Sequence, residues 1–254
     1  MRRAILICAA LLALALLLKK TANASEGTAQ RAIPRPAQMV VTVADGWNSS
    51  TGKLQCYERM KNGWRPAFAK PISVLLGRNG LAWGRGLHQV SKTGPQKREG
   101  DGRAPAGVFQ IGKIYTHDQR LPDGADYPFR TVTKWDAWVD DPSLPEYNRH
   151  IVVDPRRVPK WFEKQKMRHG DAAYRWLIEV RHNADPPKPG AGSAIFFHTR
   201  RGPDRKTSGC TTMHSRDLVE IMRWLDPKKH PQYTLLPRAE YEQVKDRWNL
   251  PEAP

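Results

Sequence analysis

The residues best suited to chemistry in this sequence are a histidine and a cysteine twelve positions apart. His198 lies near the end of an apolar run, residues 193–199, and Cys210 follows a basic loop. A cysteine attacks as its thiolate, and a neighbouring imidazole can take the thiol proton and stabilise the anion. We therefore predict a catalytic pair, with the pKa of the thiol below the value of about 8.5 for free cysteine.

Gly209 directly precedes the cysteine and leaves the backbone sterically open there. The backbone N–H groups of Gly209 and Cys210 are predicted to converge on a developing oxyanion, each contributing about 3 kcal/mol in the transition state. Two alternatives remain on spacing alone. Cys210 also fits a small buried apolar residue. His198, Cys210 and His214 supply three possible zinc ligands, but no second close pair of Cys or His completes a site. We expect no metal and no cofactor.

The elements that must position these residues are mainly short strands. Strand-like runs bounded by Gly, Pro or polar clusters occur at residues 39–43, 54–60, 72–76, 108–111, 174–180 and 193–198. Asn62 and Gly63 give a strong hairpin signal after the second run. Cys56 lies in that alternating run, so it is predicted to be a structural, half-buried thiol. The pattern indicates a mainly β domain.

A few helices complete the prediction. Ser215 is expected to cap a helix with an apolar stripe that ends before Pro227, a second helix is expected over 239–248, and a weaker one over 158–167. The connections between 116 and 149 are long and proline-rich, as in functional lids or substrate walls. Trp135, Trp138 and Tyr147 in this region either line a groove or pack in the core.

The N-terminus has the pattern of an export signal. Two arginines precede an apolar run over residues 4–18, and two lysines lead to Ala22-Asn23-Ala24. We interpret residues 1–24 as a signal peptide, residues 25–37 as a flexible tether and residues 38–254 as the catalytic domain. The run is short for a spanning helix, although an uncleaved anchor remains an alternative. The expected location is the periplasm or cell envelope.

Composition restricts the partners. The chain carries 42 Lys and Arg against 25 Asp and Glu, a net charge of +17, and its hydrophobic fraction of 39% excludes a polytopic membrane protein. Nucleic acid is not expected in an exported compartment, whereas anionic wall polymer, carboxylate-bearing peptide or a membrane surface suits it; a basic surface without a specific partner is the alternative. Beyond the signal only Cys56 and Cys210 remain, so either they pair or at least one is a free thiol.

Two separated motifs resemble one family. The string from His198 to Ser208-Gly209-Cys210, preceded by residues 190–197 (GAGSAIFF), resembles the signature of L,D-transpeptidase catalytic domains, the YkuD-like enzymes of bacterial cell walls. Residues 97–109 (KREGDGRAPAGVF) resemble the family's strand-leading segment, and residues 138–142 and 147–149 are similar to a less-studied branch. The resemblance runs from about residue 38 to residue 236.

The resemblance implies a β-rich, sandwich-like or barrel-like catalytic fold that acts on peptidoglycan stem peptides. In it, Cys210 attacks the carbonyl between a diamino acid and D-alanine, and His198, oriented by a backbone carbonyl, acts as base and then as acid. A second amine resolves the thioester. The resemblance further implies a monomer whose substrate is contacted by Ser208, Thr212, Arg149 and Tyr147.

One departure from the family bears on the substrate. Family members usually carry an aliphatic residue and then Arg or Asn after the cysteine, where this chain has Thr211 and Thr212. A lost guanidinium removes a bidentate carboxylate donor, for which Arg200, Arg201 or Arg149 are candidate substitutes. Three functions stay open: an L,D-transpeptidase, an L,D-carboxypeptidase or endopeptidase with water as acceptor, and a non-catalytic wall-binding protein.

Overall fold

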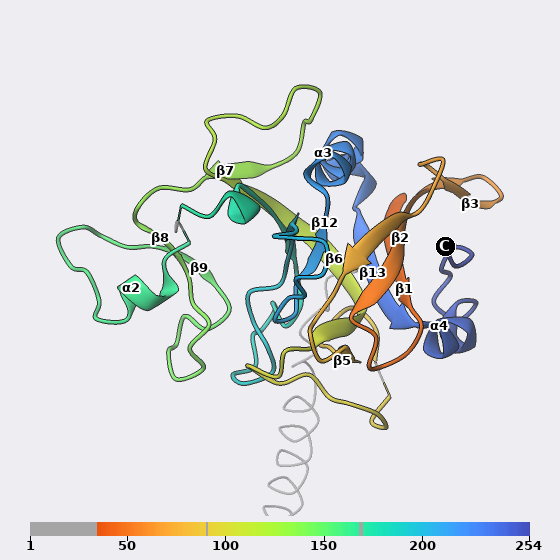
Figure 1. Cartoon of the computed structure of the whole chain (residues 1–254), viewed down its shortest axis with the longest axis horizontal. Coiled ribbons are helices and arrows are strands. Elements are labelled where there is room, and N and C mark those ends of the chain that lie inside the picture. The colour runs from red at the N-terminus through yellow and green to blue at the C-terminus, as the bar shows by residue number, and fades with distance from the viewer. Residues whose placement is uncertain (1–34, 90, 168–169) are drawn as a thin grey trace, which may run out of the picture. The chain divides into compact units, whose positions relative to one another are not determined.

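The computed structural model describes residues 35–89, 91–167 and 170–254, which are built mainly from strands (Figure 1). The strands are β1 (Gln38–Ala44), β2 (Thr51–Met60), β3 (Gly63–Pro66), β4 (Ile72–Leu75), β5 (Leu81–Trp83), β6 (Ala104–Thr116), β7 (Phe129–Thr131), β8 (Asp136–Trp138), β9 (His150–Val152), β10 (Trp176–Val180), β11 (Phe196–Thr199), β12 (Thr211–Met213) and β13 (Gln232–Pro237). The predictions for the signal peptide and for the tether up to residue 34 lie outside the described residues.

The main sheet closes on itself. Its strand order runs β1-β13-β6-β10-β11-β12-β4-β2, and β1 pairs in parallel with β13 while it pairs antiparallel with β2. Closure leaves the large apolar side chains of the strands in one interior, with Phe109, Phe197 and Tyr233 almost fully buried there. Full closure also removes the exposed edges that an open sheet would present. The prediction of a mainly β, barrel-like fold is confirmed.

The helices within the described part of the chain are few and short. They are α2 (Phe162–Gln165), α3 (Ser215–Trp224) and α4 (Arg238–Val244), with 3-10 turns η1 (Ala172–Tyr174) and η2 (Pro227–Lys229). Helix α3 buries Leu218, Ile221 and Met222, the stripe expected from the sequence. The predicted cap at Ser215 is wrong by one residue, because His214 is the extended residue before the helix and Ser215 is its first helical residue. None of the helices in the described residues has the length and apolar character that a membrane crossing requires.

A segment outside the barrel forms one wall of the cavity described below. In this wall segment, residues 129–167, strands β8 and β9 make their own two-stranded sheet, and α2 packs against them. Its anchor is the buried carboxylate of Asp136, which accepts hydrogen bonds from Arg130, from Thr133 and from His150 at 2.7 Å. The sequence predicted long connections here, and the structure shows three short strands within them or at their end.

Candidate active site

Parallel pairing of β11 with β12 brings the histidine and the cysteine together. His198 lies opposite Thr212, and Phe197 lies opposite Thr211. Because successive strand residues point to opposite faces, Phe197 and Met213 enter the core, while His198, Cys210 and Thr212 face outward. All three outward residues line one cavity of about 370 Å³. The pairing of β11 with β12 therefore brings His198 and Cys210 to the same cavity, although a basic loop of eleven residues separates them in the sequence.

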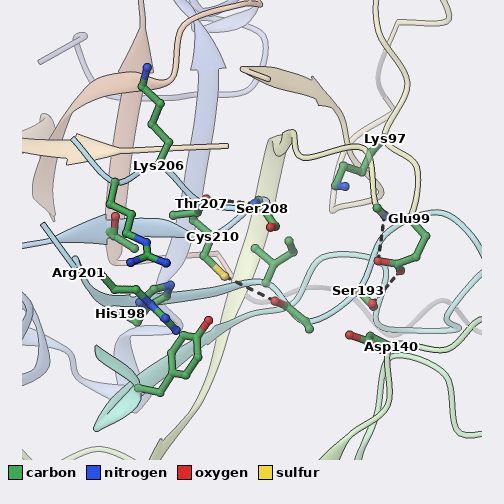
Figure 2. Close-up of a pocket in the computed structure, with 17 residues that line it drawn as sticks. Lys97, Glu99, Asp140, Ser193, His198, Arg201, Lys206, Thr207, Ser208 and Cys210 are labelled. Carbon is green, nitrogen blue, oxygen red and sulfur yellow. Dashed lines mark hydrogen bonds between the residues drawn. The ribbon is translucent and has the colours of Figure 1, made fainter. Parts of the chain in front are cut away.

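Cys210 lies where two cavities meet. The larger is the catalytic cavity, drawn in Figure 2, whose lining side chains come from the loops around residues 97–100, 193–195 and 201–209 as well as from β11 and β12. The smaller, about 150 Å³, lies against the wall segment and is lined by Trp138, Met167, Tyr174, Leu177, Phe196 and Cys210 among others. Residue Cys210 therefore lines both cavities.

The thiol itself is protonated at neutral pH. Burial raises the pKa of Cys210 to about 11, and neither the hydrogen bond from the Phe196 N–H nor the charge of Lys97 offsets this effect. The Cys210 Sγ donates to the carbonyl oxygen of Ala194 at 3.6 Å. The prediction of a lowered thiol pKa is wrong, because the site is desolvated and the neighbouring imidazole carries no charge to stabilise a thiolate.

His198 is a neutral base held in one tautomer. His198 is 4% exposed, and burial lowers the pKa of its imidazole to about 4. Its Nδ1 lies 3.0 Å from the carbonyl oxygen of Thr199. Since a carbonyl only accepts, Nδ1 must carry the proton, which makes Nε2 the basic nitrogen. The expectation that a backbone carbonyl orients this histidine is confirmed.

Tyr174, the last residue of η1 just before β10, covers the histidine, and its pKa is raised by burial and by the nearby Cys210. The tyrosine ring meets the imidazole edge to face, with centroids 4.9 Å apart. The Arg201 guanidinium lies 4.8 Å from the centroid of the same tyrosine ring and forms an ion pair with Asp171. The sequence analysis assigned Tyr174 no role. The sequence feature that could have pointed to it is its position as the first residue of the strand predicted over 174–180.

The turn before the cysteine differs from the prediction. Gly209 has φ +153°, and a Cβ there would lie 3.0 Å from both Arg103 O and Ile195 Cδ1, so the turn requires glycine. Its N–H, however, donates to Thr207 Oγ1 at 3.0 Å, and that hydroxyl donates to the Cys210 carbonyl at 2.7 Å. The predicted oxyanion donor Gly209 N–H is therefore engaged within the turn, which leaves the Cys210 N–H as the turn's other candidate.

The four predicted substrate contacts separate into two groups. Ser208 and Thr212 line the catalytic cavity. Tyr147 is 2% exposed and does not line this cavity; its hydroxyl donates to Glu99, which does. Arg149 lies in a different cavity, beside Tyr115, Tyr127 and Trp138. The intervening residue, Asn148, has φ +55° and is fixed by buried hydrogen bonds, which turns the chain away from the nucleophile.

The threonines after the cysteine leave the cavity without the usual cation at that position. Thr211 is buried against the Tyr233 hydroxyl at 2.9 Å, and only Thr212 faces the cavity. Of the arginines considered as substitutes, Arg201 lines the cavity, and Arg205 and Lys206 join it from the same loop. Cys56 and Cys210 are both free thiols, and Cys56 is fully buried rather than half-buried.

Comparison with known proteins identifies the family to which this chain belongs. The family model of the L,D-transpeptidase catalytic domain (YkuD) matches residues 48–234, a span that contains both walls of the cavity, His198 and Cys210. Among curated proteins no match was found, and none was found among solved structures. The family match covers most of the chain and agrees with the closed, mainly β fold. The chain therefore belongs to the L,D-transpeptidase catalytic domain family.

Proposed function

We propose that the protein is a cysteine-dependent peptidoglycan L,D-transpeptidase that acts on stem peptides through a thioester acyl-enzyme. The observation that carries the proposal is the shared placement of Cys210 and a neutral His198 in one cavity of a YkuD domain. The altered Thr211-Thr212 segment does not remove either residue. A protein that only binds wall material has no use for a nucleophile and a base in one cavity.

The acylation step follows from the protonation states. The Cys210 Sγ attacks the carbonyl carbon between the diamino acid and D-alanine while its proton passes to His198 Nε2. The Cys210 N–H donates to the oxyanion that forms. When the tetrahedral intermediate collapses, the C–N bond breaks and the imidazolium returns its proton to the amine of the departing D-alanine. The stem peptide is left as a thioester on Cys210.

The second half of the reaction reverses these roles. The side-chain amine of a neighbouring stem attacks the thioester carbonyl, loses a proton to His198 and forms the new peptide bond, and the thiolate takes that proton back. The opening of Cys210 to two cavities supports separate approaches for donor and acceptor. Water in place of the amine would give a tripeptide and define an L,D-carboxypeptidase on the same site.

The cationic loop is proposed to bind the terminal carboxylate of the donor stem peptide. Arg201, Arg205 and Lys206 line the cavity near the thiol, and the Asp171 ion pair with the aromatic contact to Tyr174 holds the Arg201 guanidinium in place. A guanidinium binds a carboxylate through two parallel hydrogen bonds, which a threonine does not reproduce. This loop is proposed to replace the family's arginine. The proposal includes export to the envelope, where the substrate lies.

One experiment tests the function and its alternatives. The purified protein is incubated with tetrapeptide-bearing muropeptides, and the products are separated by mass. Cross-linked dimers support the transpeptidase, and tripeptide monomers with free D-alanine identify the carboxypeptidase. An unchanged substrate that still binds the native protein and its Cys210→Ala variant alike would replace both with a wall-binding role.

A further inference from the structure

The catalytic cavity carries opposite charges at its two ends. Figure 2 shows Glu99 and Asp140 on one side of Cys210, and Arg201 and Lys206 on the other. The cationic end is proposed above to bind a carboxylate. Because the chain as a whole has a net charge of +17, its overall composition does not explain why two carboxylates gather at one end of the cavity.

Glu99 is held rigidly with its carboxylate at the cavity. Its Oε2 accepts hydrogen bonds from the Tyr147 hydroxyl and, at 2.7 Å, from the Ser193 hydroxyl. Both donors are buried, with Tyr147 2% and Ser193 7% exposed. Among the described residues, the one further hydrogen bond to this carboxylate is local, from the Gly100 N–H to Oε1 at 3.3 Å. Two buried residues thus fix one oxygen, and the second retains capacity to accept from a ligand.

The protein supplies this carboxylate with no cation. No ion pair within the described residues includes Glu99 or Asp140, although Lys97 lines the same cavity; the Lys97 ammonium is paired with Asp101 at 2.5 Å. The pKa of Asp140 is raised by burial and by the negative charge of Glu99. The two carboxylates therefore lie near enough to repel each other, and a bound cation would relieve that repulsion.

We propose that Glu99, assisted by Asp140, binds the side-chain ammonium of the diamino acid whose carbonyl is attacked by Cys210. The inference rests on the proposed function, because it identifies how that substrate is oriented. With the ammonium at Glu99 and the D-alanine carboxylate at the cationic loop, the scissile carbonyl lies between them at the thiol. The reverse orientation brings like charges together at both ends. The acceptor amine is excluded from this role, because it attacks as the free base.

The test first compares two substrates with the native protein and then compares protein variants with the same two substrates. Two tetrapeptide donors that differ only in whether the diamino acid side-chain amine is free or acetylated are compared with the same acceptor amine in excess, and release of D-alanine is measured. We expect the native protein to process the free-amine donor with a kcat/KM at least tenfold higher. In Glu99→Gln this preference should fall to about twofold or less, chiefly through KM, and Asp140→Asn should reduce it partially. Glu240→Gln on α4 is the matched control and should keep the native preference.

A second readout separates specificity from damage to the site. Acylation of Cys210 by a carbapenem without a basic side chain needs the nucleophile but no ammonium, so Glu99→Gln should slow it far less than it lowers kcat/KM for the free-amine donor. Equal processing of both donors by the native protein would overturn the inference and leave the function standing. Processing of neither donor would overturn the proposed function and this inference with it. A parallel loss of carbapenem acylation in Glu99→Gln would make Glu99 a structural residue and likewise overturn the inference.

Discussion

The ring of Tyr174 meets the imidazole of His198 edge to face, with centroids 4.9 Å apart and planes inclined by 67°. This contact shields the proposed catalytic base, His198, from solvent. Because desolvation penalises the charged imidazolium, burial is the main cause of the lowered pKa of His198, about 4. The base is consequently neutral and available across the whole physiological pH range.

Truncation of the tyrosine should move the acid limit of activity. The reaction requires neutral His198, so kcat/KM falls as the pH drops through the imidazole pKa. In Tyr174→Ala water reaches the ring and its pKa rises toward the ordinary value of about 6.5, which shifts this limb upward by about one to two pH units. Tyr174→Phe keeps the ring and should keep the native limb. A pH profile of kcat/KM for the three proteins checks the prediction, and an unshifted limb in Tyr174→Ala would refute it.

The thiol should titrate far above neutrality in the free enzyme. With a pKa of about 11 for Cys210, the thiolate fraction at pH 7 is roughly 300-fold below that of a free cysteine. Alkylation by iodoacetamide should therefore be slow at pH 7 and should accelerate as the pH approaches 11. The rate is measured by mass spectrometry, with Cys210→Ala as the blank. A rate that reaches its plateau near pH 7 would show a stabilised thiolate instead.

Acylation by a β-lactam should nevertheless be efficient, since His198 removes the proton during attack. A carbapenem offers a strained amide carbonyl, and we expect a single adduct on Cys210. The adduct should be absent in Cys210→Ala and should form about 10² to 10⁴ times more slowly in His198→Ala, the usual contribution of a general base. Intact-mass kinetics and peptide mapping test this. Equal rates with and without His198, or an adduct on Cys56, would refute the catalytic pair.

The strands that the sequence predicted are those with a clear pattern. Strand β2 ends at Met60 before a Lys61-Asn62 turn, with Gly63 opening β3, and β4 is a short β-branched run, so both were identified. Strand β13 was missed although it pairs with both β1 and β6, because all its residues are buried and it shows no alternation. Strands β7, β8 and β9 have three residues each, too few to establish a period.

The proposed nucleophile and base could be chosen from the sequence because one local motif contains both. The rest of the site comes from segments distant in sequence: Glu99 precedes β6, Asp140 follows β8, and Tyr174 precedes β10. Their convergence depends on tertiary packing, which spacing does not report. The thiol pKa was mispredicted for a related reason. Nearness of a histidine in the sequence says nothing about burial, and burial determines both protonation states.

Cys56 should be dispensable for activity. It is a free, fully buried thiol in β2, and burial raises its pKa well above the ordinary value, so it is neither bonded to Cys210 nor reactive. Cys56→Ser should retain native kcat/KM while losing about 1–2 kcal/mol of stability, because a hydroxyl is poorly accommodated in an apolar interior. Activity assays with urea denaturation check both parts. A rise in activity under oxidising conditions in Cys56→Ser would instead indicate a bridge to Cys210.

The wall segment should depend on the buried carboxylate of Asp136. Burial opposes ionisation of Asp136, but hydrogen bonds from Arg130, Thr133 and His150 outweigh it and hold its pKa well below the usual range. Asp136→Ala removes the shared acceptor and leaves the half-buried His150 without it, which should lower the free energy of unfolding by about 3 kcal/mol at pH 7. Asp154→Ala, which removes an exposed ion pair in the same segment, should leave the free energy of unfolding nearly unchanged.

The same carboxylate gives this stability a defined pH dependence. A depressed folded-state pKa contributes stability that is fully present above the unfolded value of about 3.9 and is lost as the pH falls from there toward the folded value. The difference in unfolding free energy between native protein and Asp136→Ala should thus be constant from pH 7 to about pH 5 and should shrink below pH 4. Urea denaturation followed by tryptophan fluorescence measures it, since Trp135 and Trp138 flank Asp136 in the segment. A difference that stays constant down to pH 2 would show that Asp136 stabilises the wall by packing and not by its charge.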